Sequence, residues 1–296
     1  MQIIDGKKLR VKILEKVKSE VASLAFQPVF CDVLVGGDPS SAQYVKMKAK
    51  TAESVGIKFH NADFPESITT DELIKEIKIL NKVKNMCGII IQLPLPEHLD
   101  KSKILNSIDS HLDVDCLGDV ASEKFYNDYN IQTDLGYPTA LACMALLDSI
   151  DLDLDPSTPL GAGKKIVVLG QGMLVGKPVS ALLKYRGLNP IIIRSKTPDK
   201  EQLIKEADII ISGMGSGKYL TGNMVKKGVV IIDAGTSEEV SGSLSGQGRV
   251  NIVGDVDLES VKDVAGYVSP VPGGVGPVTV AMLLSNVLKV AKSLNK

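Results

Sequence analysis

The sequence predicts an α/β fold built from two domains. Short apolar runs alternate with segments whose apolar residues recur every three or four positions, which is the pattern of repeating βα units. One run, Cys87–Ile91, is continuously apolar, as in a parallel strand that is buried on both faces. The chain has 296 residues, enough for two domains of ordinary size.

The first half predicts strands that alternate with helices. An apolar stripe predicts a helix over residues 7–24, and Ser41 can cap a second helix that ends near Gly56. Thr69 and Glu72 have the spacing of a capping box, which predicts the start of a third helix. The predicted strands are residues 29–35, 57–64 and 87–91.

The second half begins after residues 117–135, which show no regular pattern. A helix is predicted over 137–150, a surface loop at 241–248, and a final helix over 278–294 that should pack on the first domain. Predicted strands follow at 165–169, 191–193, 209–211, 229–232 and 251–253, with 266–268 strand-like. We therefore expect one domain of residues 1–136 plus 277–296, a second of residues 137–276, and a cleft between them.

The composition limits the classes of partner. Lys and Arg number 34, Asp and Glu number 35, and the net charge is −1, so neither nucleic acid nor a membrane surface is indicated. The charged N-terminus does not resemble a signal peptide, and we expect no bilayer-spanning segment. The four cysteines have no metal-site spacing and are expected to be reduced. A cytoplasmic protein without a metal is predicted.

A glycine-rich turn follows the strand at 165–169. Gly170-x-Gly172-x-x-x-Gly176 places glycines where a backbone can approach a pyrophosphate at a helix N-terminus. Glycines occur in any tight βα turn, so the turn alone is a weak signal. Within alternating strands and helices it predicts a doubly wound, Rossmann-type nucleotide-binding domain.

The residues after the second strand of this domain favour NADP. An NAD-specific domain usually carries an acidic residue there, whereas this chain has Arg194-Ser195-Lys196-Thr197. Two cations and two hydroxyls suit a 2′-phosphate. The alternative is that Arg194 and Lys196 are solvated loop charges.

Three candidate catalytic residues lie in the first half. Tyr44 and Lys48 are four residues apart, so they share one helix face beside the core stripe that includes Val45. Gln92 follows the buried run at the carboxyl end of its strand, where ligands bind in open α/β sheets. The alternatives are a solvated basic face for Lys48 and a polar strand end for Gln92.

Two further segments have unusual composition. Asp113-Val114-Asp115 offers two carboxylates without a neighbouring histidine, which fits hydrogen bonding to a heterocycle better than metal binding. Residues 269–279 are rich in Gly and Pro, and such a rigid backbone suits contact with a flat ligand. An ordinary rigid turn is the alternative.

Several motifs occur in one order along nearly the whole chain. Together they resemble the bifunctional methylenetetrahydrofolate dehydrogenase/methenyltetrahydrofolate cyclohydrolase family, and the second and last motifs are highly specific. The motifs are Ser41-x-x-Tyr44-Val45-x-x-Lys48, Gln92-Leu93-Pro94-Leu95-Pro96, Asp113-Val114-Asp115, Gly170…Val175-Gly176-x-Pro178, Gly254-Asp255-Val256 and Pro270-Val271-Pro272-Gly273-Gly274-Val275-Gly276-Pro277.

The resemblance implies a homodimeric enzyme of one-carbon metabolism that supplies purine biosynthesis. NADP takes a hydride from methylenetetrahydrofolate, and water opens the methenyl product to 10-formyltetrahydrofolate. Lys48 is the implied catalytic amine, Gln92 supports it, Tyr44 packs on the folate and Asp115 holds the pterin. The implied substrate-binding set adds Val45, Ile91, Leu93, Pro272, Gly273, Gly274, Val275 and Gly276. The implied cofactor-binding set is Gly170, Gln171, Gly172, Val175, Gly176, Arg194, Ser195 and Thr236.

The chain also departs from the family pattern. Gln171 and Gly172 stand where Arg and Ser are usual, Arg194 where His is common, and Cys116 where Gly is usual. We hypothesise that Arg194 replaces the missing loop cation. The other readings are a dehydrogenase without cyclohydrolase activity, a catalytically silent folate- or nucleotide-binding regulator, and another two-domain dehydrogenase of the shikimate type.

Overall fold

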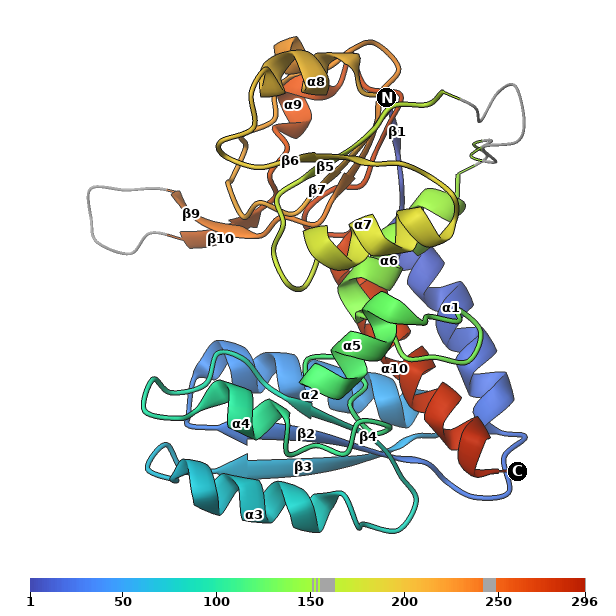
Figure 1. The fold of residues 1–296 in the computed structure, drawn as a ribbon, viewed down its shortest axis with the longest axis vertical. Coiled ribbons are helices and arrows are strands. Elements are labelled where there is room, and N and C mark those ends of the chain that lie inside the picture. The colour runs from blue at the N-terminus through green and yellow to red at the C-terminus, as the bar shows by residue number, and fades with distance from the viewer. Residues whose placement is uncertain (151, 153, 155–162, 242–248, 296) are drawn as a thin grey trace. The chain divides into compact units, whose positions relative to one another are not determined.

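The computed structural model describes residues 1–150, 152, 154, 163–241 and 249–295 (Figure 1). Contacts divide the chain into unit 1, Met1–Arg10 with Thr139–Thr279, and unit 2, Val11–Pro138 with Val280–Lys296. We expected the first ten residues in the catalytic domain. They belong to unit 1, because β1 (Gln2–Ile3) pairs with β11 (Tyr267–Val268) in its sheet.

Unit 2 contains a small parallel sheet with the order β3-β2-β4. The strands are β2 (Val29–Val35), β3 (Lys58–Phe64) and β4 (Met86–Ile91), each within two residues of its predicted bounds. Every residue of β2 and β4 is buried, as the continuous apolar run of β4 predicted. The carboxyl ends of β2 and β4 therefore lie side by side.

The helices of unit 2 begin with recognisable caps. Thr69 and Glu72 form the predicted capping box at α3 (Thr70–Leu80). The prediction that Ser41 caps α2 (Pro39–Ser54) was wrong. Asp38 is the cap, because its carboxylate accepts a hydrogen bond from the Ser41 backbone N–H at 2.7 Å. The remaining helices are α1 (Gly6–Val21), α4 (Lys101–Leu105) and α5 (Asp119–Asn127).

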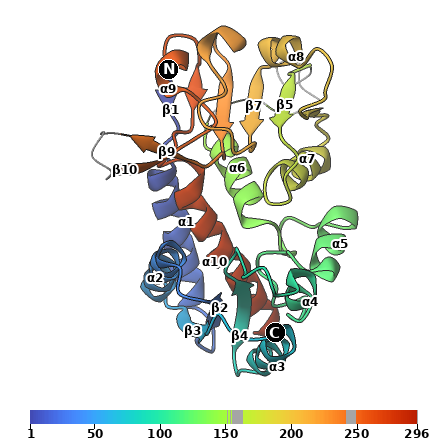
Figure 2. The same ribbon diagram turned by 90° about the vertical axis from the view of Figure 1, so that its left-hand side faces the viewer.

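The last helix, α10 (Val275–Leu294), packs against β4 as predicted (Figure 2). Gly88 makes this approach possible, because a Cβ at that position would lie 2.9 Å from Val287 Cγ2. By length and composition α10 could span a bilayer, contrary to our expectation for the sequence. However, 61% of the relevant window is buried inside the protein, as in a core helix.

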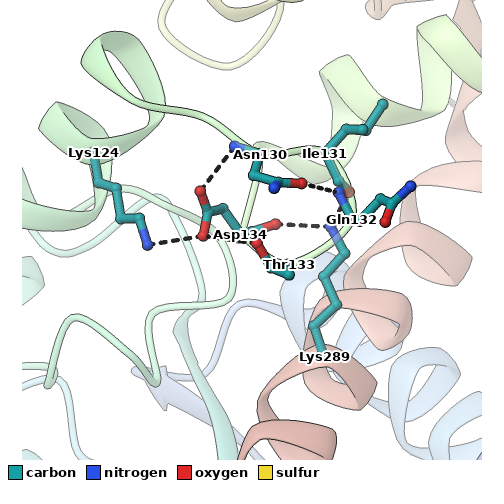
Figure 3. Close-up of polar contacts among 7 residues, drawn as sticks. All are labelled: Lys124, Asn130, Ile131, Gln132, Thr133, Asp134 and Lys289. Atoms are coloured by element: carbon teal, nitrogen blue, oxygen red, sulfur yellow. Dashed lines mark hydrogen bonds and ion pairs between the residues drawn. The ribbon is translucent and has the colours of Figure 1, made fainter.

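The segment after α5 is held to α10 by polar contacts rather than by regular structure (Figure 3). Lys289 Nζ donates to the carbonyls of Ile131 and Asp134 at 2.9 and 2.7 Å, and burial lowers the pKa of Lys289. The Asp134 carboxylate pairs with Lys124 at 2.8 Å and accepts the Asn130 backbone N–H at 2.8 Å. These contacts hold the part of the segment that follows α5, whereas residues 119–127 form α5 itself, a helix that the sequence pattern did not predict.

Unit 1 contains a parallel sheet with the order β1-β11-β8-β7-β5-β6. The strand order reverses between β5 (Ile166–Leu169) and β7 (Ile209–Ser212), which makes their carboxyl ends a topological switch point. The remaining elements are α6 (Pro138–Asp148), α7 (Gly176–Tyr185), β6 (Ile191–Ile193), α8 (Lys200–Glu206), the 3₁₀ helix η1 (Gly222–Met224), β8 (Val230–Asp233) and α9 (Leu258–Val261).

One predicted strand of this half lies outside the main sheet. Residues 251–253 belong to β10 (Arg249–Val253), which pairs antiparallel with β9 (Ser237–Ser241) as a two-stranded ribbon. The short apolar pattern alone did not distinguish a ribbon strand from a sheet strand. The predicted loop at 241–248 lies, from residue 242 on, outside the described residues.

Candidate functional site

Lys48 is the centre of a buried polar cluster in unit 2. Its side chain is 3% exposed, and Nζ lies 2.6 Å from Asp32 Oδ2 and 2.7 Å from Gln92 Oε1. Nζ also lies 4.8 Å from the centroid of the Tyr44 ring, within the range of a cation–π contact. The alternative of a solvated basic face is therefore wrong for Lys48.

Gln92 is fixed by the backbone at the end of β4. Its N–H donates to the carbonyl of Val33 on β2 at 2.9 Å, and its Nε2 donates to the Leu93 carbonyl at 3.0 Å. These two bonds leave Oε1 to accept from Lys48. The strand end that the sequence predicted as a ligand-binding position thus holds the Lys48 amine in one place.

Asp32 was not among the predicted site residues. It lies within β2 with 0% exposure, and its pairing with Lys48 joins β2 to α2. Burial raises the pKa of Asp32, and the neighbouring Lys48 charge opposes this shift. The available signal was an acidic residue inside an otherwise apolar run, Val29–Val35.

Tyr44 lies on the outer side of this cluster. The residue is 39% exposed, so the ring covers Lys48 with one part and leaves another part accessible. Burial of its hydroxyl, with smaller contributions from the Asp115 and Asp32 charges, raises the pKa of Tyr44 to about 12. The phenol therefore stays protonated at neutral pH and can donate a hydrogen bond.

The two aspartates of Asp113-Val114-Asp115 have different environments. Asp113 Oδ2 accepts the Gly118 N–H at 2.7 Å, so this carboxylate stabilises its own turn. Asp115 is half-buried, and burial of its carboxyl raises its pKa to about 7, although the Lys48 charge opposes the shift. Near neutral pH Asp115 can accept or donate a proton to a polar ligand.

The turn that carries Asp115 is anchored from α10. Asn286 Nδ2 donates to the carbonyls of Val114 and Gly136 at 2.8 and 2.7 Å. Cys116, at the position where the family usually has Gly, adopts a φ of 58°. Only glycine adopts such backbone without strain, which explains the usual residue at that position.

The other predicted substrate contacts of unit 2 are mostly core side chains. Val45 and Ile91 are 5% and 2% exposed, so they support the cluster from behind rather than present a surface. Leu93 is half-buried and precedes a cis peptide bond to Pro94. Among these three, only Leu93 has side-chain surface available to a ligand.

The predicted Pro272–Gly276 segment forms a tight turn in unit 1 at the start of α10. The Gly274 N–H donates to the Pro270 carbonyl at 2.7 Å, and Gly273 has a φ of 114°. At Gly274 a Cβ would lie 2.7 Å from the Pro270 carbonyl oxygen, whereas at Gly276 it would meet no atom within 4 Å. The bare backbone of this turn is thus partly required by its own geometry.

A cavity of about 400 Å³ lies at the switch point of unit 1. Its lining brings together the predicted residues Gly170, Gln171, Gly172, Arg194 and Ser195. Residues not singled out from the sequence complete it, namely Lys200, Met214, Ser216 and Tyr219, together with Leu169, Ile193, Ile204 and Gly213. The predicted residues Val175, Gly176 and Thr236 do not line it.

Two glycines of the turn have a structural requirement. Gly170 has a φ of 88°, and a Cβ at Gly176 would lie 2.2 Å from the Gly170 carbonyl oxygen. A Cβ added at Gly172 would meet no atom within 4 Å, so the space beside this glycine is open to a ligand. Gln171 turns back, and its Nε2 donates to the Gly170 carbonyl at 2.8 Å.

Asp255 shapes the far edge of this cavity. Its Oδ2 accepts the Ser212 hydroxyl at 2.6 Å and the Met214 N–H at 2.8 Å, and its Oδ1 accepts the Ser216 N–H at 2.7 Å. Two lining residues are therefore fixed through one buried carboxylate. The Gly254-Asp255-Val256 motif has a structural role in the cavity wall.

These residues fit a dinucleotide phosphate. The turn presents backbone at Gly172, Arg194 and Lys200 supply positive charge, and Ser195 supplies a hydroxyl. Such a set matches phosphate groups at the carboxyl edge of a parallel sheet.

Comparison with known families identifies both parts of the chain. Residues 138–295 match the family model of the tetrahydrofolate dehydrogenase/cyclohydrolase NAD(P)-binding domain, and residues 4–115 match that of the catalytic domain. The chain belongs to the tetrahydrofolate dehydrogenase/cyclohydrolase family. The alternative of a shikimate-type dehydrogenase is therefore wrong.

Full-length relatives support this assignment. The bifunctional protein FolD of Nautilia profundicola is 41% identical, with 100% of this chain and 99% of the relative covered. The crystal structure of the bifunctional FolD enzyme of Campylobacter jejuni is 37% identical over 99% of each chain, with a TM-score of 0.88. A Trypanosoma brucei FolD structure, complexed with NADP and an inhibitor, is 32% identical over 99% of this chain and 97% of its own, with a TM-score of 0.87.

Proposed function

We propose that this chain oxidises methylenetetrahydrofolate with NADP and hydrolyses the methenyl product to 10-formyltetrahydrofolate. The observation that carries the proposal is the buried Lys48 amine, held by Gln92 and Asp32 within the part of the chain that matches the catalytic domain. A buried, fixed amine can accept and return a proton in the metal-free hydrolysis of an electrophilic carbon.

Substrate binding is assigned to both ends of the polar cluster. Asp115, whose pKa of about 7 lets it exchange hydrogen-bond roles, faces the pterin N–H groups in this proposal. Tyr44 contributes its accessible ring surface to the folate, and Leu93 contributes apolar surface. Pro272–Gly276 of unit 1 stays a predicted substrate-binding segment, because no Cβ covers its peptide groups at Gly273, Gly274 and Gly276.

The cofactor is assigned to the cavity at the switch point of unit 1. When bound, NADP supplies a hydride acceptor. Gly172 leaves room for the pyrophosphate, while Arg194 and Ser195 contact the 2′-phosphate. Met214 and Ser216, which Asp255 holds in place, form the wall that orients the rest of the NADP molecule.

The hydrolytic step is assigned to Lys48. Loss of the hydride leaves a methenyl carbon that is electrophilic without a metal. The Lys48 amine takes a proton from water as the water oxygen bonds to that carbon. The bond from the carbon to one ring nitrogen then breaks as the new hydroxyl becomes the formyl carbonyl and releases its proton to solvent, and the Lys48 ammonium returns its proton to that nitrogen. Gln92 Oε1 keeps Nζ in position throughout.

The test of this function is an absorbance record of methenyltetrahydrofolate after the protein, methylenetetrahydrofolate and either NADP or NAD are mixed. We expect an NADP-dependent rise, followed by a decay faster than uncatalysed hydrolysis. A rise without accelerated decay would identify a dehydrogenase without cyclohydrolase activity. The absence of any rise would contradict the proposal in favour of a catalytically silent binding protein.

The choice of NADP over NAD is expected to depend on Arg194. Replacing it in Arg194→Ala should weaken NADP binding by about ten- to a hundredfold, because a charged hydrogen bond contributes roughly 1.5–3 kcal/mol. NAD binding should change little, since NAD lacks the 2′-phosphate. The measurement is KM for each cofactor. Lys196→Ala is the control, because Lys196 is an exposed cation two residues away that does not line the cavity. Equal losses for NADP and NAD would refute the assignment.

We further propose a cytoplasmic homodimer that joins through its nucleotide-binding domains and has no nucleic-acid or membrane partner. The family resemblance and the net charge of −1 support this. Its 10-formyl product would enter purine biosynthesis.

A further inference from the structure

Asp32 is an unusual residue for its place in the fold. It lies within the central strand of the unit 2 sheet, paired in register with Asn61 on β3 and Ile90 on β4, and is 0% exposed. Its Oδ2 contacts Lys48 Nζ at 2.6 Å, and its Oδ1 has no hydrogen-bond partner among the described residues. Burying a carboxylate costs free energy that strand packing does not return.

Asp32 therefore interacts with the Lys48 amine rather than contributing to the packing of the sheet. Lys48 is the residue that the proposed hydrolysis requires, and Asp32 is its only anionic contact closer than 4 Å in the described part of the chain. Gln92 contacts the same Nζ but is neutral, so it directs the amine without changing its charge.

We propose that Asp32 is a positioning residue for the hydrolytic step, the counter-ion that holds Lys48 against Gln92 and sets the pH range in which hydrolysis proceeds. This inference rests on the proposed function. It makes a side chain on β2 the counter-ion of Lys48. The catalytic residues expected from the sequence, Tyr44, Lys48, Gln92 and Asp115, do not include it.

The charged surroundings favour this role. Burial raises the pKa of Asp32, Lys48 opposes that shift, and the charge of Asp63 adds to it. The charge of Lys48 thus acts on both Asp32 and Asp115. The titratable groups that shift the pKa of Asp32 are Lys48 on α2 and Asp63 on β3. Besides burial, the charge of Asp32 in turn raises the pKa of Cys31 on the same strand, Tyr44 on α2 and Asp115 on the turn beside β4.

The effect on chemistry has a definite sign. An anion in contact favours the ammonium over the amine. Hydrolysis begins with the amine, so Asp32 delays the onset of hydrolysis to higher pH while keeping a proton available for the leaving nitrogen. Removing the negative charge should let the amine form at lower pH.

The test is the pH profile of kcat for methenyltetrahydrofolate hydrolysis, corrected for the uncatalysed rate, in Asp32→Asn. The side chain keeps its shape and a hydrogen-bonding oxygen. We expect the ascending limb to move by at least about one unit toward lower pH. Asp32→Glu, which keeps the charge, should restore the wild-type limb. Asp63→Asn is the matched control, because Asp63 is a more exposed carboxylate on the neighbouring strand without contact to Lys48, and its limb should not move.

An unmoved limb in folded Asp32→Asn would overturn the inference, even if its rate were reduced. Dehydrogenase activity in the same sample reports that the variant is folded. If wild-type protein shows no accelerated hydrolysis, the proposed function fails as well, which distinguishes the two failures. Should Asp32→Asn not fold, the carbon-13 carboxyl resonance of Asp32 in wild-type protein decides: a carboxylate across the limb supports the inference, and a protonated carboxyl overturns it.

Discussion

Lys48→Met is expected to abolish cyclohydrolase activity and also to destabilise the fold. The substitution keeps the apolar stem but removes the only cation that contacts Asp32 within the described residues. Removing one partner of a buried ion pair costs about 3–5 kcal/mol, because the remaining charge is left buried without compensation. The free energy of unfolding, measured with urea and far-UV circular dichroism, should fall by about that amount.

The double variant Asp32→Asn with Lys48→Met separates catalysis from stability. It removes both charges, so it should recover most of the lost stability, while hydrolysis stays absent. NADP binding should persist in both variants, because the cofactor cavity lies in unit 1. Near-normal hydrolysis in Lys48→Met would remove Lys48 from the mechanism, and an unchanged free energy of unfolding would show that the pair is not buried as described.

The stability loss of Lys48→Met should also depend on pH. Lys48→Met removes both the charge and the hydrogen bond that lower the pKa of Asp32. Burial then holds the pKa of Asp32 further above its ordinary value of 3.8. The carboxyl ionises near 3.8 in the unfolded chain and at its raised pKa in the folded variant. Between these two points the folded protein keeps the proton while the unfolded chain loses it, so the free energy of unfolding falls as pH rises through this window. The deficit relative to wild type should therefore shrink as pH is lowered toward 4. A deficit that grew on acidification would contradict this account.

The residues that sequence patterns located best are those whose neighbours in sequence determine their position. The continuous run of β4 predicted a buried strand, and its end predicted where Gln92 would lie. Helical spacing placed Tyr44 and Lys48 on one face. Asp32 was missed because its partner lies sixteen residues away on another element, and an acidic residue in an apolar run has no local reason.

Short elements were missed for a related reason. β1 has two residues and α4 has five, so neither carries a full period of any pattern. β1 exists because its backbone pairs with β11, which lies at the other end of the chain. Such elements are stabilised by tertiary contacts rather than by propensity. The same holds for α5 and the loop that Lys289 ties to α10.

Gly176→Ala is expected to disrupt the cofactor cavity from within. The new Cβ would lie 2.2 Å from the Gly170 carbonyl oxygen and 2.9 Å from Gln171 Cα, both backbone atoms that cannot rotate away. The turn must open, which should cost about 1–3 kcal/mol of stability. Because the turn also holds Gly170 and Gln171 in the cavity wall, NADP affinity should fall at least about tenfold, as measured by titration calorimetry.

Gly172→Ala distinguishes strain from ligand contact. Its Cβ meets no protein atom within 4 Å, so the urea midpoint should equal that of wild type. NADP affinity should still fall, because the methyl group occupies the side from which a pyrophosphate approaches the helix N-terminus. Unchanged NADP affinity in Gly172→Ala would show that the phosphates bind elsewhere. Wild-type stability in Gly176→Ala would show that the turn can accommodate a methyl group despite the short distances to Gly170 and Gln171. Together the two variants test whether Gly176 is required for the conformation of the turn and Gly172 for binding of the ligand.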